Sequence, residues 1–190
     1  MIASHNSWTF LPTTKWWMKL ISPFCTCQTL NIQEQYNLGI KFFDLRLVYE
    51  NNKYYIAHNK AKYSIVGLTD DLIFLNNKGD CIIRVSLDCR KEKDCTPLQI
   101  TKFREYCNYL ESVYRNISFV DGRCIGTGLS IYCFNHLTPC FVDGYSSKQG
   151  KGIFRYIPWL YAKYKAKKHY KYINETCCYV MLDFINKDIC

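Results

Sequence analysis

Short apolar runs alternate along the chain with stretches in which apolar residues recur at helical spacing. The runs rich in β-branched and aromatic residues predict strands over Ile2–His5, Ile40–Val48, Tyr54–Ala57, Cys81–Leu87, Leu129–Phe134, Cys140–Val142 and Tyr179–Ile185. The helical spacing predicts helices over Asn31–Leu38, Leu68–Asn76, Thr96–Tyr114 and Ile157–Tyr172. This alternation is typical of α/β proteins.

The ends of several elements carry their own signals. Thr96 is a candidate N-cap and Pro97 suits the first turn of the helix that follows. Gly39 is a plausible stop for the helix before it. The residues Glu50-Asn51-Asn52-Lys53 predict a turn between two strands.

Polar residues stand at or near the ends of four predicted strands. They are His5, the pair Asp44 and Arg46, Asp88, and Asp183. In α/β barrels the catalytic groups gather at the carboxyl ends of the strands, so these side chains are expected to surround one site. The chain has 190 residues, whereas a TIM barrel typically needs about 250. We therefore expect a small or incomplete TIM-type barrel, formed by residues 1–190 as a single catalytic domain.

Asp44 and Arg46 lie two positions apart and therefore point to the same face of a strand. Charges buried in a barrel interior are costly unless they are paired or functional. A plain structural ion pair is the alternative reading.

His5 and His58 are two of only four histidines. Histidine titrates nearest neutral pH, so two of them can share the acid and base roles in phosphoryl transfer. An arginine between them would hold a phosphate through two parallel hydrogen bonds. A single histidine, by contrast, would be more simply read as a surface or satisfied core residue.

The formal net charge is +9, which favours anionic partners such as phosphate esters or membrane surfaces. No nucleic-acid-binding motif is present, so we expect no nucleic-acid partner. The helix predicted over Ile157–Tyr172 combines basic and aromatic residues, which suits either an anionic membrane or a solvated outer face. An N-terminal aromatic cluster is either a membrane-facing rim or a buried cluster; its members are Trp8, Phe10, Trp16 and Trp17.

The sequence contains twelve cysteines but no recognisable signal peptide and no apolar run long enough to cross a bilayer. We therefore expect a cytoplasmic or peripheral membrane protein whose cysteines are mostly reduced. Cys25-Thr26-Cys27 and Cys177-Cys178 lack the repeated spacing of a structural zinc site, so buried free thiols are the simpler interpretation.

Three segments together resemble the phosphatidylinositol-specific phospholipase C X-domain family. Ser4-His5-Asn6-Ser7-Trp8 is similar to the family's first histidine motif, and Gln33 to Arg46 is similar to its "EQL..GIRYFDLR" segment. His58 then falls twelve residues after Arg46, where that family has its second histidine. The strand that contains Asp183 resembles the final strand of the family.

The resemblance implies a phosphodiesterase that acts through a cyclic phosphate on phosphatidylinositol or a related lipid. It implies that His5 is the general base, that Asp183 orients it, and that His58 protonates the leaving alcohol. Arg46 would bind the phosphate and Asp44 would support the site electrostatically. Asn6 and Asp88 would contact the substrate. A monomer is expected.

The resemblance is closer to the bacterial, metal-independent members, because Arg46 stands where calcium-dependent members have a metal ligand and has no lone pair to offer. We expect no metal cofactor. Calcium remains an alternative, with Asn6, Asp44 and Asp88 as its oxygen ligands. Asn6 also deprives His58 of the acidic partner that bacterial members usually provide. Two other functions stay open: a non-catalytic relative that binds phosphoinositides or other phosphate esters, and a phosphodiesterase acting on a soluble substrate.

Overall fold

The computed structural model describes residues 1–58, 61–89, 95–125, 133–134, 139, 141–142 and 179–185. Its strands are β1 (Ile2–Ser4), β2 (Phe42–Glu50), β3 (Lys53–His58), β4 (Ala61–Tyr63), β5 (Cys81–Asp88), β6 (Ile117–Ile125), β7 (Phe141–Val142) and β8 (Tyr179–Leu182). Its helices are α1 (Met18–Ile21), the 3-10 turn η1 (Ser22–Phe24), α2 (Ile32–Asn37), α3 (Leu68–Lys78) and α4 (Pro97–Val113).

Local sequence signals explain where most of these elements begin and end. α2 and α4 both start with a capping box, in which the side chains of Asn31 and Thr96 accept from the backbone N–H three residues later. The turn between β2 and β3 places Asn51 and Asn52 at φ 52° and 58°, a left-handed conformation that asparagine tolerates well.

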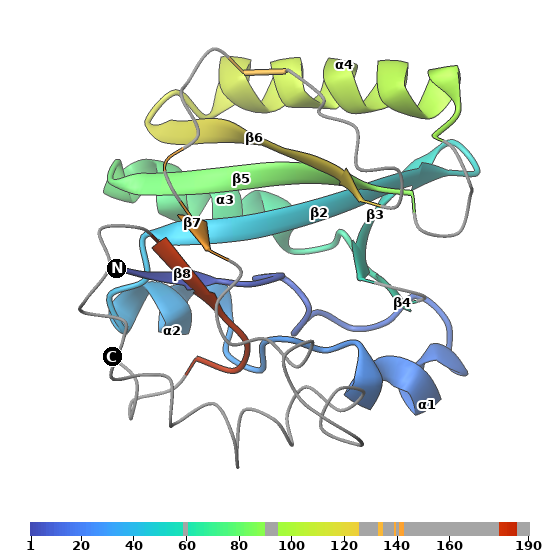
Figure 1. Cartoon of the computed structure of the whole chain (residues 1–190), viewed down its shortest axis with the longest axis horizontal. Helices are drawn as coiled ribbons and strands as arrows, with labels where there is room; N and C mark the ends of the chain where they lie inside the picture. Colours follow the sequence, from blue (N-terminus) through green and yellow to red (C-terminus); the bar gives the residue numbers. More distant parts are fainter. Residues whose placement is uncertain are drawn as a thin grey trace.

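The strands form one curled sheet (Figure 1). Parallel pairing runs in the order β7–β8–β1–β2–β5–β6. β3 pairs antiparallel with the second half of β2, and β4 pairs with β3. No pairing joins β6 to β7 within the described part of the chain. The fold is therefore an α/β, incomplete TIM-type barrel, as predicted from the sequence.

The two faces of the sheet bury different kinds of residue. Phe43, Leu45 and Leu47 of β2 point outward into the main core, which also contains buried residues of the helices such as Leu72 and Phe103. Figure 1 shows α4 lying along the sheet beside β6. A smaller apolar cluster occupies the inner face and consists of Ala3, Phe42, Val120 and Met181. Because side chains alternate along a strand, the residues two positions after Ala3, Phe42 and Met181 also face inward; they are His5, Asp44 and Asp183.

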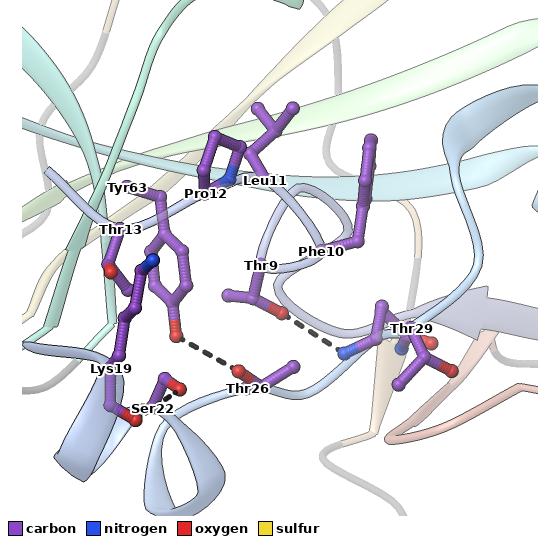
Figure 2. Close-up of a pocket in the computed structure, with 11 residues that line it drawn as sticks. Thr9, Phe10, Leu11, Pro12, Thr13, Lys19, Ser22, Thr26, Thr29 and Tyr63 are labelled. Atoms are coloured by element: carbon purple, nitrogen blue, oxygen red, sulfur yellow. Dashed lines mark hydrogen bonds between the residues drawn. The ribbon is translucent and has the colours of Figure 1, made fainter. Parts of the chain in front are cut away.

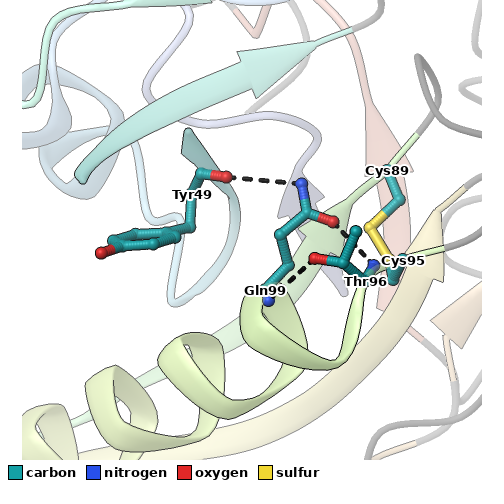
Figure 3. The surroundings of a disulfide bond; sticks show 5 residues. All are labelled: Tyr49, Cys89, Cys95, Thr96 and Gln99. Atoms are coloured by element: carbon teal, nitrogen blue, oxygen red, sulfur yellow. Dashed lines mark hydrogen bonds between the residues drawn. A yellow bond between two sulfur atoms is a disulfide. The ribbon is translucent and has the colours of Figure 1, made fainter. Parts of the chain in front are cut away.

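A disulfide joins Cys89 to Cys95, between the end of β5 and the start of α4 (Figure 3). Next to it, Gln99 closes the capping box of Thr96 and also donates to the carbonyl of Tyr49. The expectation of reduced cysteines is therefore wrong for this pair. Among the described residues, the free cysteines are Cys25, Cys27, Cys81, Cys107 and Cys133.

Some predicted elements fall outside the described residues. They are the helix over Ile157–Tyr172 and most of the strand over Leu129–Phe134. Four described elements had no counterpart in the prediction: α1, η1, β4 and β6. Across the part of the chain that the structure describes, no helix is both long and apolar enough to span a bilayer.

Candidate active site

The predicted site residues meet at the carboxyl ends of the parallel strands. His5 and Asp183 follow β1 and β8, Asp44 and Arg46 lie in β2, and His58 ends β3. The strand register places these positions together, since Ala3 pairs with both Phe42 and Met181. All five side chains are buried despite their polarity. Such burial requires either full pairing or a function.

Asp44 is the centre of a buried ion cluster. Its Oδ2 accepts from Arg46 Nε at 2.9 Å and its Oδ1 accepts from Arg84 Nε at 3.0 Å. Burial alone would raise the pKa of Asp44, but the two guanidinium groups overcome this and hold its pKa well below the usual range. Asp44 is therefore a permanent carboxylate that fixes Arg46 in place.

His5 lies between an acid and a cation. Its Nδ1 is 2.6 Å from Asp183 Oδ1, and its Nε2 is 2.6 Å from Arg46 Nη2. A guanidinium can only donate, so Nε2 must accept and the ring proton must reside on Nδ1, pointing at Asp183. The site thus holds the tautomer whose Nε2 lone pair can take a proton from a substrate hydroxyl.

His58 is supported differently from what the sequence suggests. Its ring lies edge-on to that of His5 with the centroids 5.7 Å apart. Its Nδ1 lies 2.5 Å from the carbonyl oxygen of Cys25 and 3.4 Å from Cys27 Sγ. A carbonyl only accepts, so Nδ1 carries the proton. A backbone carbonyl therefore supports His58, for which the sequence offered no acidic partner.

Asn6 and Asp88 complete the set of predicted residues. Asn6 is buried, donates its backbone N–H to Asp44 and directs its side-chain nitrogen at His5 Nε2 and Cys27 Sγ. Asp88, at the end of β5, is also buried. Burial by itself would lower the pKa of Arg46. The negative charge of Asp88 is one of the nearby groups that act in the opposite direction and raise this pKa.

The oxygen atoms proposed for calcium do not fit that cation. Both carboxylate oxygens of Asp44 already accept from guanidinium groups, and the side-chain nitrogen of Asn6 faces His5. A cation placed between Asp44 and Asn6 would stand against the positive charge of Arg46.

Two backbone conformations mark this region. Asn6 and Phe184 have φ values of 47° and 52°, directly after His5 and Asp183. Left-handed backbone is tolerated by asparagine but strained for a bulky residue such as phenylalanine, and such strain often accompanies functional sites. The N–H of Phe184 donates to the carbonyl of Cys27 at 2.6 Å, which ties the strained turn to the segment that carries Cys27.

Three residues of the site were not predicted. Arg84 was missed, although the sequence contains a signal for it. Arg84, Ser86 and Asp88 lie two positions apart from one another and therefore point to the same inward face as Asp44 and Arg46. Cys27 was interpreted as a core thiol, and its place beside the histidines follows only from the path of residues 25–29. Gln28 is buried and donates to the carbonyls of His5 and Leu182, so it holds the ends of β1 and β8 together.

A separate cavity of about 310 Å³ lies beside this cluster. Figure 2 shows its lining, in which hydroxyl groups and Lys19 face Phe10, Leu11 and Pro12. None of the predicted catalytic residues lines it. Thr9 connects the two regions, because its hydroxyl accepts from the backbone N–H groups of Cys27 and Gln28.

The curled sheet, with polar groups at the carboxyl ends of its strands, has the fold of solved bacterial phosphatidylinositol-specific phospholipase C structures. No protein-family model matches the sequence, and no curated protein matches it either. The solved structures do. Phosphatidylinositol-specific phospholipase C from Listeria monocytogenes superposes with a TM-score of 0.65 at 13% identity, covering 100% of this chain and 89% of the Listeria chain.

Two structures of the phosphatidylinositol-specific phospholipase C from Staphylococcus aureus match with TM-scores of 0.58 and 0.57, at 12% and 13% identity. Each match covers 97% of this chain and 85% of the other. The resemblance predicted from the sequence is thus confirmed at the level of the fold. This similarity concerns the fold and not the activity or the substrate.

Proposed function

We propose that this chain is a phosphodiesterase that cleaves phosphatidylinositol or a related phosphodiester by acid–base catalysis. The observation that carries the proposal is the hydrogen-bonded series Asp183–His5–Arg46–Asp44 on the inner face of the half-barrel. A buried site that only binds a phosphate needs the arginine, but it has no use for an oriented imidazole with an accepting Nε2 next to it.

The resting contact between Arg46 and His5 suggests how a substrate starts the reaction. A phosphate that enters the site competes for the Nη2 group of Arg46, because a charge-assisted bond to phosphate is stronger than a bond to a neutral imidazole. His5 Nε2 is then released to take the proton of the neighbouring substrate hydroxyl. Asp44, which is paired with Arg84 as well, keeps the guanidinium aligned during this exchange.

The proposed reaction closes a cyclic phosphate within the substrate as the alcohol leaves. The hydroxyl oxygen that loses its proton to His5 attacks phosphorus, and the bond from phosphorus to the leaving oxygen breaks. His58, protonated at both nitrogens, gives a proton to the leaving alcohol while the carbonyl of Cys25 continues to accept from Nδ1. The products are a cyclic phosphate and a free alcohol, and Arg46 balances the charge on the phosphoryl oxygens.

A membrane source for the substrate is supported by an exposed apolar segment. Trp16, Leu20 and Phe24 of the α1–η1 region are 77%, 71% and 47% exposed, and Trp17 is 41% exposed. Exposed aromatic and aliphatic side chains of this kind insert into the boundary between headgroups and acyl chains. Trp8, by contrast, is fully buried, so of the two alternatives for the aromatic cluster the buried one holds for Trp8 and the exposed one for Trp16 and Trp17. Membrane binding is also the subject of the work on the Staphylococcus aureus enzyme.

The test is the release of inositol phosphate from phosphatidylinositol vesicles by the wild type and by His5→Ala. We expect turnover by the wild type, including in the presence of a chelator of calcium, and a loss of at least 10³-fold in kcat for the variant. The matched control is Lys102→Ala on α4, where the Lys102 ammonium forms an exposed ion pair with Glu105 away from the site.

Three results separate the alternatives. Equal rates for the wild type and His5→Ala would refute the mechanism. No turnover of lipid together with turnover of a soluble cyclisable phosphodiester would keep the chemistry and replace the substrate. Binding of phosphoinositide vesicles without turnover of either substrate would favour a non-catalytic relative.

A further inference from the structure

Cys27 has surroundings that acid–base catalysis does not require. The thiol is fully buried, and its ligand atom shares a small space with those of His5 and Asp183. One donor atom from each of the three residues can be chosen so that all lie within 4.8 Å of one another. The three residues come from different parts of the chain, after β1, before α2 and after β8, so the grouping is a product of the fold.

The donor set has the composition of a zinc site. A thiolate, an imidazole and a carboxylate are the three ligand types that zinc binds in proteins, with bond lengths of about 2.0–2.3 Å. A tetrahedral site with those bonds separates its ligand atoms by about 3.5 Å. The ligand atoms of His5, Cys27 and Asp183, which lie within 4.8 Å of one another, must therefore move closer by on the order of 1 Å to bind the metal. Small rotations of the three side chains supply these shifts.

The charge around the cluster is compatible with a cation. The inner face carries the carboxylates Asp44, Asp88 and Asp183 against the guanidinium groups of Arg46 and Arg84. The carboxylates exceed the guanidinium groups by one, and Asp183 contacts the ring nitrogen of His5 opposite the one that contacts Arg46, so a cation on the Asp183 side is turned away from that guanidinium. A soft thiolate among the ligands favours zinc and similar ions over calcium or magnesium, which prefer oxygen atoms.

We infer that His5, Cys27 and Asp183 form a binding site for a thiophilic divalent cation of the zinc class, and that its occupation inhibits the enzyme. The inhibitory part rests on the proposed function. It follows because a metal bound at either nitrogen of His5 removes the base: at Nε2 it consumes the accepting lone pair, and at Nδ1 it leaves the ring proton on Nε2. The carboxylate of Asp183 is also withdrawn from its orienting contact.

The experiment uses Co²⁺ as a spectroscopic substitute for zinc on the full chain, with the disulfide intact. Wild-type protein is expected to develop the near-ultraviolet thiolate-to-cobalt charge-transfer band, to saturate it at about one equivalent, and to lose it when Zn²⁺ is added. Excess Ca²⁺ should leave the band unchanged. Cys27→Ala should abolish the band, and His5→Ala should weaken cobalt binding at least tenfold.

Cys25→Ala is the matched control, because it removes a buried thiol two residues away and preserves the backbone carbonyl that contacts His58. It should retain the band. Cys27→Ser, which is nearly isosteric, replaces Cys27→Ala if the alanine variant fails to fold, as judged by near-ultraviolet circular dichroism. A wild type without the band, or a band that persists in both variants of Cys27, would overturn the inference.

The activity assay keeps this inference distinguishable from the proposed function. With a phosphodiester substrate, one equivalent of Zn²⁺ should suppress turnover by the wild type, and a chelator should restore it. Turnover that continues unchanged while the cobalt band is saturated would refute inhibition. A saturable band in a chain that never turns over a phosphodiester would contradict the proposed function and leave the metal site standing.

Discussion

The contact between His5 and Asp183 gives the sharpest prediction about the mechanism. Asp183→Asn replaces a carboxylate oxygen 2.6 Å from His5 Nδ1 with an amide of almost the same shape. Asp183 is 3% exposed, so no water molecule from bulk solvent readily substitutes for the lost charge. The change therefore tests orientation and charge, while the volume of the side chain is preserved.

The size of the effect depends on which atom of the new amide faces the imidazole. If the amide nitrogen faces Nδ1, the ring proton moves to Nε2 and His5 can no longer accept, as when the aspartate of a catalytic triad is replaced, which costs about 10⁴-fold in kcat. If the amide oxygen faces Nδ1, the tautomer survives and the loss is that of a charge-assisted hydrogen bond. That loss is about 1.5–3 kcal/mol, or roughly 10–100-fold.

The environment favours the larger effect. Asp183 is a hydrogen-bond partner of both Cys27 and His5, so an amide with one oxygen satisfies only one of the two donors. We expect kcat to fall by about 10²–10⁴-fold, with a much smaller change in KM, since Arg46 still binds the phosphate.

The assay is steady-state turnover of the phosphodiester that the wild type cleaves, with thermal unfolding recorded on the same samples. Asp80→Asn is the matched control, because the Asp80 side chain is 52% exposed and its partners, Lys41, Tyr36 and Cys81, lie outside the site. Its kcat should stay within twofold of the wild type. A fall of less than tenfold for a folded Asp183→Asn variant would refute the assigned role of Asp183.

Three further predictions concern stability. Arg84→Met removes one of the two cations that hold Asp44 ionised, so the free energy of unfolding should fall by about 3 kcal/mol in urea; an unchanged midpoint would contradict the ion cluster. Burial, with a smaller contribution from a neighbouring carboxylate, raises the pKa of Asp71 to about 6 in the folded chain, so its stabilising contribution is present below about pH 4 and lost as the pH rises to 6. Asp71→Asn should flatten the dependence of the free energy of unfolding on pH between 4 and 6. It should also raise the free energy of unfolding at pH 7 by on the order of 1 kcal/mol, a value reduced for partial exposure. A pH profile identical to that of the wild type would argue against this effect. Cys95→Ser removes the disulfide with Cys89, which closes a loop at a sequence separation of 6, and should lower the free energy of unfolding by about 2 kcal/mol. A reductant that destabilises this variant as much as the wild type would contradict a stabilising role for the disulfide.

The sequence was most informative where a residue's neighbours along the chain decide its structure. The capping residues Asn31 and Thr96, the asparagine turn after Glu50 and the alternation of β2 and β5 depend on local geometry, and the structure reproduces them. The spacing of Asp44 and Arg46 similarly fixes their shared face, because side chains on a strand alternate. β4 was missed because it is short and gains its hydrogen bonds from β3.

The site as a whole depends on contacts that no local pattern contains. His5 and Asp183 are 178 positions apart. Their places at strand ends put them near one site, but the sequence indicates their direct contact only through the family resemblance. The sequence by itself determined the α/β pattern and the residue types available for catalysis. The tertiary structure decided that Cys27 lies beside the two histidines, that Arg84 shares Asp44, and that the Cys25 carbonyl supports His58. The physical reason is that closing the sheet between β1 and β8, with Gln28 bridging both, sets these distances.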